Sequence, residues 1–530
     1  MNYKKIAERR RSALARSAGG KAVKIHTEGK GIGVVKTLAV GFFILLQLAL
    51  MLLLFLGVTT SFIWYQLLAM ALSLICCIHV LSSEKTGQTK TVWVLFLTVF
   101  FYFGYIFYVL SSEYIFFGRA RLRYGEIFAR TAEYTPEYPR LSDISVQTAR
   151  DCEYLKAVGG FAAYTNSRLK YFPSGAKLFD DVLKQLEGAK KFIFIEFFII
   201  SDGLLFEKFF EILSKKAADG VKVRIICDGM GSHGTLSMKN RKRLKNAGID
   251  LRFFNRIAPM FTFALNLRDH RKIIVIDGKT AYTGGCNLAD EYINRKLMRG
   301  YWKDTGLKIE GGAVGAISLI FLRQWEFITR TAEDYSPYLL ENAADAAAGE
   351  GVVVPYADGK DYNHGICKGV FENIIAGAQK RLYIMTPYFV PDEDTANLLA
   401  LKARSGVDVK IILPDLPDKA YVYRVTIDNA ERLLSSGVRI FKMSGAFVHA
   451  KLMLSEGCAY VGSANLDLRS YYNQFENGVY FTSTSAMEEA LQDFEKVLEI
   501  CAEITAENAA RNKLFSRIAA GVLRIFSPLM

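Results

Sequence analysis

One part of the chain occurs in two similar copies, and this repeat restricts the fold more than any other feature. "EGAKKFIFIEFFI" (187–199) is matched by "AGAQKRLYIMTPYF" (376–389), and "GVKVRIICD" (220–228) is matched by "GVDVKIILPD" (406–415). In each copy short apolar runs alternate with helical patterns. Strands that alternate with helices indicate mostly parallel sheets with helices on their faces. The repeat therefore predicts a duplicated α/β domain.

A long region without charge precedes the repeat. Residues 37–83 contain no Asp, Glu, Lys or Arg, and "TVWVLFLTVFFYFGYIFYVLSS" (91–112) forms a second uncharged run. A helix that crosses about 30 Å of hydrocarbon needs only about 20 residues. The first run is long enough for two passes with a turn at "GVTTS" (57–61), and the second run is a third candidate. We therefore expect an integral membrane protein.

These features divide the chain into seven expected segments: a basic cytoplasmic N-terminus (1–36), a transmembrane region of two or three helices (37–112), a juxtamembrane linker (113–150), a first repeat (151–330), a mobile acidic linker (331–350), a second repeat (351–505) and a C-terminal amphipathic helix (506–530).

The side of the membrane that carries the repeats stays open. The first 36 residues contain ten Lys or Arg, which favours a cytoplasmic N-terminus. Three full passes would then place the repeats outside. However, four arginines follow the third run closely and favour the inside: Arg119, Arg121, Arg123 and Arg130. One of the runs could instead be re-entrant or interfacial.

Charge and cysteine content narrow the expected partners. The net charge of +14 favours an anionic partner, either nucleic acid or an anionic bilayer. Beside the apolar runs, we expect anionic lipid and no nucleic acid. The eight cysteines show no CxxC spacing, so neither a disulfide framework nor a zinc site is expected.

Each copy carries a histidine and a lysine two residues apart within a short apolar run. The first pair lies in "RDHRKIIVIDG" (268–278) and the second in "FVHAKLMLSEG" (447–457). If each run is one strand, both side chains point to the same face. Burying an ammonium without a partner is costly. Both copies continue with an acid, a glycine pair or Gly-Ser, and an asparagine: Asp277, Gly284, Gly285 and Asn287, then Glu456, Gly462, Ser463 and Asn465.

A pseudo-twofold axis between the repeats would bring both pairs to one cleft suited to a phosphodiester. The lysines and asparagines could neutralise the phosphate oxygens. One neutral imidazole could attack phosphorus, and the other could act as acid and then base. No carboxylate cluster has metal-ligand spacing, so we expect no metal and no cofactor.

The HxKxxxxD pattern with its trailing GG-N or GS-N resembles the phospholipase D superfamily. Longer strings resemble bacterial cardiolipin synthases, among them "NLRDHRKIIVIDGKTAYTGGCNLADEY" and "VHAKLMLSEGCAYVGSANLDLRSYYNQFENGV". The resemblance implies two phospholipase D-like repeats with mixed sheets, flanked by helices and preceded by transmembrane helices. It also implies a multi-pass protein of the bacterial cytoplasmic membrane that joins two phosphatidylglycerols into cardiolipin and releases glycerol.

The resemblance also implies roles for single residues. His270 would be the nucleophile, forming a phosphatidyl-histidine, and His449 the acid–base partner. The expected phosphate ligands are Lys272, Lys451, Asn287, Asn465 and Ser463. Asp304 and Glu476 match acids that orient a catalytic histidine. Asp277 and Glu456 complete the two catalytic motifs. The family has Asp where this chain has Glu456. Because Glu456 lies past the end of the strand, its position favours a structural role.

Other interpretations stay open at this level. The same chemistry with water as acceptor would make the protein a phospholipase D-type hydrolase or a nuclease, and an inactive membrane scaffold could retain the fold. Asp304 and Glu476 could form ordinary ion pairs. Glu196 interrupts an apolar strand and is expected to be a buried structural acid.

Overall fold

The computed structural model describes residues 63–83, 87–111, 113–135, 144–255, 267–296, 300–339, 349–362 and 365–505, with a few single positions elsewhere. The predicted basic N-terminus, the apolar run before residue 63 and nearly all of the predicted C-terminal helix lie outside the described residues.

The first repeat is built on a seven-stranded mixed sheet. Its strands follow the spatial order β1 (Ser167–Phe172), β9 (Gly306–Gly311), β7 (Thr280–Gly284), β6 (Lys272–Ile276), β2 (Phe192–Phe197), β3 (Lys222–Asp228) and β4 (Asp250–Phe254). The last three are parallel, and the other pairings are antiparallel.

The second repeat has the same strand order. Its sheet runs β10 (Val352–Asp358), β19 (Gln474–Thr482), β17 (Ala459–Gly462), β16 (Leu452–Ser455), β11 (Arg381–Met385), β13 (Asp408–Pro414), β14 (Arg439–Met443) and β20 (Cys501–Ile504). The shared order confirms the predicted duplication and the two mixed sheets.

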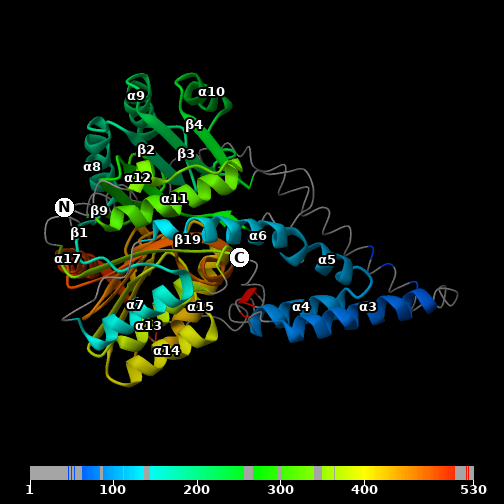
Figure 1. The fold of residues 1–530 in the computed structure, drawn as a ribbon. Coiled ribbons are helices and arrows are strands. Elements are labelled where there is room, and N and C mark those ends of the chain that lie inside the picture. The colour runs from blue at the N-terminus through cyan, green and yellow to red at the C-terminus, as the bar shows by residue number, and fades with distance from the viewer. Residues whose placement is uncertain are drawn as a thin grey trace, which may run out of the picture.

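Helices cover both faces of each sheet (Figure 1). The apolar strand β2 is buried on both sides: Ile193 and Ile195 pack in the same cluster as α8 (Gly175–Glu187) and α9 (Leu204–Ala218), whereas Phe194 packs toward α11 (Ala313–Thr329). Helix α11 lies between the repeats. The remaining helices of the two repeats are α10 (Met238–Asn246), α13 (Ile366–Gly377), α14 (Glu393–Arg404), α15 (Ala420–Leu434), α16 (Leu468–Tyr472) and α17 (Ser485–Leu498).

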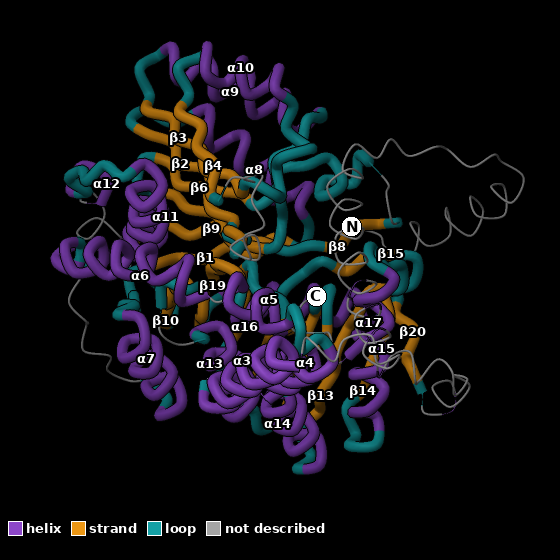
Figure 2. The backbone as a smooth tube through the Cα atoms, turned by 90° about the vertical axis from the view of Figure 1, so that its right-hand side faces the viewer, coloured by secondary structure: helices purple, strands orange, loops and turns teal. Residues whose placement is uncertain are grey.

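The two repeats exchange short strands beside the histidines. In the first repeat β5 (Arg268–Asp269) pairs with β19 of the second. In return, β15 (Ala446–Val448) of the second repeat pairs with β8 (Tyr301–Lys303) of the first, and Figure 2 shows these two strands side by side. The condition that each His-x-Lys lies in one continuous strand is therefore not met, because the chain passes there from a strand shared with the other repeat into its own sheet.

The N-terminal helices project from the side of this body (Figure 1). They are α3 (Ile63–Ser82), α4 (Gly87–Val99) and α5 (Gly104–Ser111). Among the described residues α3 is the only helix long and apolar enough to cross a membrane. The run 91–112 is divided between α4 and α5 by a turn at 100–103, so the expected third pass is not one continuous helix. Multiple transmembrane helices are therefore not confirmed.

The described parts of the two predicted linkers, 113–135 with 144–150 and 331–339 with 349–350, pack on the body. The segment 113–150 contains α6 (Glu113–Arg130) and the start of α7 (Val146–Gly159). The ring of Tyr124 stacks on Phe327 of α11 at 3.8 Å, and its hydroxyl donates to Gln324 at 2.7 Å. In the second linker Glu333 pairs with Arg224, and α12 (Ser336–Leu339) follows. An acidic composition suggested a mobile linker at 331–350, but the buried side chains of Tyr124 and Tyr335 hold the described parts of both segments on the body.

Candidate active site

Each histidine of the repeated motif contacts an acid from the other repeat. His270 Nδ1 lies 3.0 Å from both carboxylate oxygens of Glu476. His449 Nδ1 lies 2.7 Å from Asp304 Oδ2. Both acids are fully buried, and both histidines are 7% exposed. The structure therefore brings together the four residues expected to form the two histidine–acid pairs.

The exchanged strands explain this geometry. His270 N donates to Phe475 O at 2.8 Å, so Glu476 follows directly on the strand pair that holds His270. His449 N donates to Lys303 O at 2.7 Å, so Asp304 occupies the same place beside His449. Backbone pairing between the repeats fixes both distances. Each histidine contacts an acid of the other repeat, so neither repeat alone contains a complete histidine–acid pair.

The two lysines lie beside the histidines and are nearly inaccessible to water. Lys272 Nζ donates to His270 O at 2.5 Å, and Lys451 Nζ donates to His449 O at 2.6 Å. Burial lowers the pKa of Lys272 to about 7 and that of Lys451 to about 8, and the positive charge of Lys451 also lowers the pKa of Lys272. Two buried cations that repel one another form a site suited to an anion.

The same burial keeps both imidazoles neutral at pH 7. It lowers the pKa of His270 well below its usual value and that of His449 to about 4, and the neighbouring lysine charges act in the same direction. With Nδ1–H donating to a carboxylate, the lone pair of each ring resides on Nε2. A neutral Nε2 is the atom needed for attack on phosphorus.

Gly285 and Ser463 occupy the same place in the two copies, and each contacts the acid that is paired with a histidine. A Cβ on Gly285 would lie 2.1 Å from Asp304 Oδ1, so only glycine leaves room for that carboxylate. The corresponding Ser463 donates its hydroxyl to Glu476. Ser463 therefore contacts the acid beside His270, and its expected role as a phosphate ligand stays a prediction.

The asparagine side chains are also held by protein groups. Asn287 Nδ2 donates to Tyr292 OH at 2.6 Å, and Asn465 Nδ2 donates to Asp467 at 3.1 Å. Tyr292 packs edge-on against His449 with ring centroids 5.3 Å apart, and Phe198 contacts His270 in the same way at 5.1 Å. The repeated motifs do not point to these two aromatic rings, although Tyr292 stands only five residues after Asn287.

Asp277 and Glu456 bind backbone instead of the histidine–lysine groups. Asp277 accepts hydrogen bonds from the amides of residues 190, 191 and 192 at 2.7–2.9 Å. Glu456 accepts from the amides of residues 379, 380 and 381 at 2.7–3.3 Å. Each acid stands at the end of its strand opposite to the lysine and clamps the turn before the neighbouring strand. These contacts agree with the structural role that the position of Glu456 past the strand had suggested, and the expected catalytic role of the two acids stays a prediction.

Glu196 is a buried acid in the core, as expected. Its side chain is fully buried, and burial, followed by the charge of Asp269, raises its pKa well above the usual range. Arg271 lies close enough to both acids to favour their charged forms. Asp269 and Arg271 are the chain neighbours of His270.

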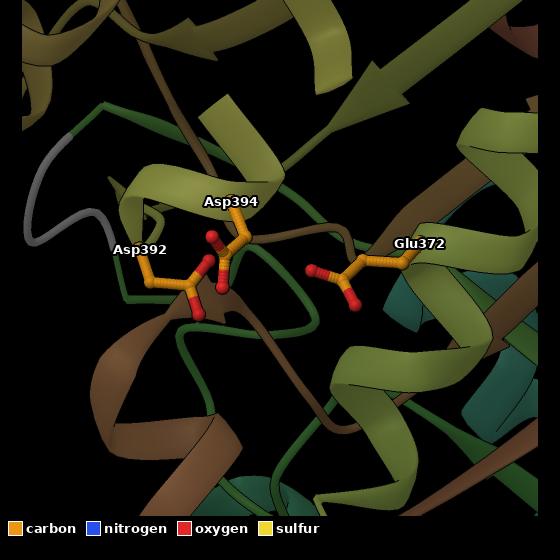
Figure 3. Close-up of side chains that lie close together, drawn as sticks. All are labelled: Glu372, Asp392 and Asp394. Carbon is orange, nitrogen blue, oxygen red and sulfur yellow. The ribbon is translucent and has the colours of Figure 1, made fainter. Parts of the chain in front are cut away.

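One cluster of three acids outside this site has ligand-like spacing (Figure 3). It contains Glu372, Asp392 and Asp394. The ammonium of Lys368 lies 2.7 Å from Asp392, 3.2 Å from Asp394 and 3.4 Å from Glu372. The cluster therefore contains its own cation, and the expectation of a metal-independent enzyme stays a prediction.

Comparisons with known proteins agree with this geometry. Residues 182–297 and 371–498 match the family described as the phospholipase D-like domain of cardiolipin synthase. Cardiolipin synthase of Listeria welshimeri is 33% identical over 84% of this chain and 95% of its own length. Cardiolipin synthase 2 of Bacillus cereus is 31% identical over 86% and 90%. The chain belongs to the cardiolipin synthase family.

Two further comparisons add to this picture. An uncharacterized protein of Streptococcus mutans is 38% identical over 74% of this chain and 85% of its own length. The crystal structure of phosphatidylserine synthase from Haemophilus influenzae aligns with a TM-score of 0.54 at 14% identity, covering 72% of this chain and 98% of that one. This second likeness shows the fold alone. Membership of the cardiolipin synthase family confirms the resemblance that the repeated motifs indicated.

Proposed function

We propose that the protein is a cardiolipin synthase that transfers a phosphatidyl group from one phosphatidylglycerol to a second and releases glycerol. Family membership supports this activity. The observation that carries the mechanism is the pair of buried histidines, each oriented by an acid of the other repeat beside a buried lysine.

In the first step His270 Nε2 attacks the phosphorus of the donor. The N–P bond forms as the P–O bond to glycerol breaks, and His449 gives its proton to the leaving oxygen. His449 must first be protonated, which its pKa of about 4 disfavours in the empty site. The negative charge of a bound phosphodiester supports protonation of His449 and of both lysines. Donor binding therefore prepares the acid.

In the second step the primary hydroxyl of another phosphatidylglycerol replaces glycerol. His449 removes its proton while the oxygen attacks phosphorus and the N–P bond to His270 breaks. Lys272 and Lys451 stabilise the charge that builds on the phosphate oxygens in both steps. His270 is assigned as the nucleophile by likeness to the superfamily.

The test is incubation of the purified full-length protein with labelled phosphatidylglycerol. We expect cardiolipin and glycerol in equal amounts, and phosphatidic acid as the main product would instead indicate a hydrolase. A brief reaction with the donor should leave an acid-labile phosphatidyl group on His270. A His449→Asn variant should slow both its formation and its breakdown, whereas label on His449 would reverse the assignment.

A further inference from the structure

Helices α4 and α5 fold back on one another as a tight antiparallel hairpin. Trp93 packs against Tyr108 with ring centroids 5.0 Å apart, and Phe96 packs against Phe107 at 6.1 Å. Residue numbers rise along one helix as they fall along the other. The apolar run that could have formed one membrane-spanning helix is therefore two short helices side by side.

The turn of the hairpin is closed by its own backbone. Phe100 N donates to Phe96 O at 2.9 Å, Gly104 N to Phe100 O at 2.5 Å and Phe107 N to Phe103 O at 3.1 Å. A Cβ on Gly104 would lie 3.3 Å from Leu97 Cα, so glycine permits the close approach of the two helices. Non-helical backbone at membrane depth needs such internal partners.

Both ends of the hairpin lie at the C-terminal end of α3. At the start of α4, Lys90 Nζ donates to Leu81 O at 3.0 Å. Near the end of α5, Tyr108 OH lies 2.6 Å from His79 Nδ1. Deeper along the helices, Ser73 Oγ donates to Leu97 O at 2.7 Å. The chain thus runs beside α3 toward its N-terminal end, turns and returns.

Neither helix of the hairpin is long enough to cross a bilayer by itself. The 13 residues of α4 extend about 20 Å at about 1.5 Å per residue. The hydrocarbon core is about 30 Å thick. Its outer surface exposes Leu95, Val99, Ile106 and Val109, beside the exposed apolar side chains of α3. The turn of the hairpin reaches the far part of α3, where Tyr102 stacks on Tyr65 with ring centroids 6.0 Å apart. Apolar side chains exposed around this hairpin fit surrounding acyl chains.

We propose that residues 87–111 form a re-entrant hairpin that enters and leaves the membrane on the same side. This inference rests on α3 spanning the bilayer, as the proposed membrane enzyme requires. The catalytic body, joined to the hairpin through α6, then lies on the side where α3 ends. The basic residues that follow, Arg119 and Arg121, are exposed on that side.

The sequence left a conflict between three full membrane passes and the arginines that follow the third run, and this topology removes it. If the apolar run before residue 63 crosses once, as the sequence predicts, two crossings return the chain to the side of its N-terminus. The basic first 36 residues and the arginines of α6 then share one side, as the bias of Lys and Arg toward the cytoplasm requires. The active site would face cytoplasmic lipid.

The test uses single cysteines added to the full-length protein in its native membrane. Gly87→Cys marks the start of the hairpin, Leu122→Cys marks the helix after it, and Ile63→Cys marks the far end of α3. All three positions are exposed. The eight native cysteines are buried or half-buried, so the unaltered chain supplies the labelling background. A membrane-impermeant maleimide is applied to spheroplasts and to inside-out vesicles.

We expect Gly87→Cys and Leu122→Cys to label only in inside-out vesicles and Ile63→Cys only in spheroplasts. Labelling of Gly87→Cys and Leu122→Cys from opposite sides would show a full crossing and overturn the hairpin. Labelling of all three from one side would show that α3 does not span, which also overturns it. The pattern does not depend on product formation, so it separates this inference from the proposed function.

Discussion

At the scale of single residues, the site places two ammonium groups where water cannot solvate them. Lys451 is 1% exposed, and its pKa falls from 10.5 to about 8. At about 1.4 kcal/mol per pKa unit, such a shift corresponds to a cost on the order of 3 kcal/mol. The empty protein carries this cost. A bound phosphate would reduce it, because the negative charge of the phosphate stabilises the ammonium.

Lys451→Met should therefore stabilise the protein and inactivate it. Methionine has a similar length without charge, so the unfolding temperature in detergent should rise while the rate falls at least about 10²–10³-fold. A lysine with a depressed pKa costs stability below its folded pKa, so the gain should be full below pH 8 and vanish toward pH 10.5. Inorganic phosphate should stabilise only the unaltered chain. A less stable variant would contradict the account.

Glu456 tests the structural role of the motif acid. Asp277 already holds three amides with the shorter side chain, so Glu456→Asp should keep most of the activity. Glu456→Ala leaves three amides to water and should lower the free energy of unfolding by about 1–2 kcal/mol. The rate per folded molecule should stay unchanged in both variants. Loss of turnover in well-folded Glu456→Asp would place the acid in the reaction.

Asp304 tests how the acid form of His449 is maintained. Burial and Lys451 lower the pKa of His449, whereas the carboxylate of Asp304 raises it. Asp304→Asn should lower that pKa further, slow transfer by about 10²–10⁴-fold and move the alkaline limb of the pH–rate profile to lower pH. The matched Glu476→Gln should slow attack by His270 without that displacement. Equal displacement in both variants would argue against separate roles.

At the scale of elements, residue patterns predicted the repeats and the His-Lys pairs, because both copies carry the same signals. They did not predict the break in each strand. Its cause is pairing with a partner about 150–200 residues away, as between Asp269 and Phe475 or between Ala446 and Tyr301, and no local pattern records such a partner. The sequence left open whether the run 91–112 crosses the membrane, because apolar content is the same for one long helix and for two short ones.

Helix α6 provides the element-scale prediction. A chain starting at residue 113 should fold and fractionate as soluble without detergent, because it loses α3, α4 and α5 but keeps α6. A chain starting at residue 132 also loses the buried side chains of Tyr124 and Ile127. Each is worth about 1.5–3 kcal/mol, so its unfolding temperature should be several degrees lower. Tyr124→Ala in the full-length chain is the matched control, and equal stability of both truncations would contradict the packing of α6.

At the scale of the whole molecule, the repeats are held by their interface. A protease site placed within 340–348 should allow the chain to be cut without loss of activity, because the exchanged strands and α11 keep the halves together. Gel filtration should show both fragments in one peak. Each fragment expressed alone should be inactive, since each lacks the acid for its own histidine. Activity in either half alone, or its loss on cutting an intact complex, would contradict this arrangement.

The exchange of strands also limits how the gene can change. A mutation that moves Glu476 harms a histidine encoded about 200 codons earlier, and a mutation that moves Asp304 harms one encoded about 150 codons later. Compensating mutations must therefore arise in the opposite half. The two halves of the gene are bound to evolve as partners, and a recombinant that replaces only one of them inherits two mismatched pairs.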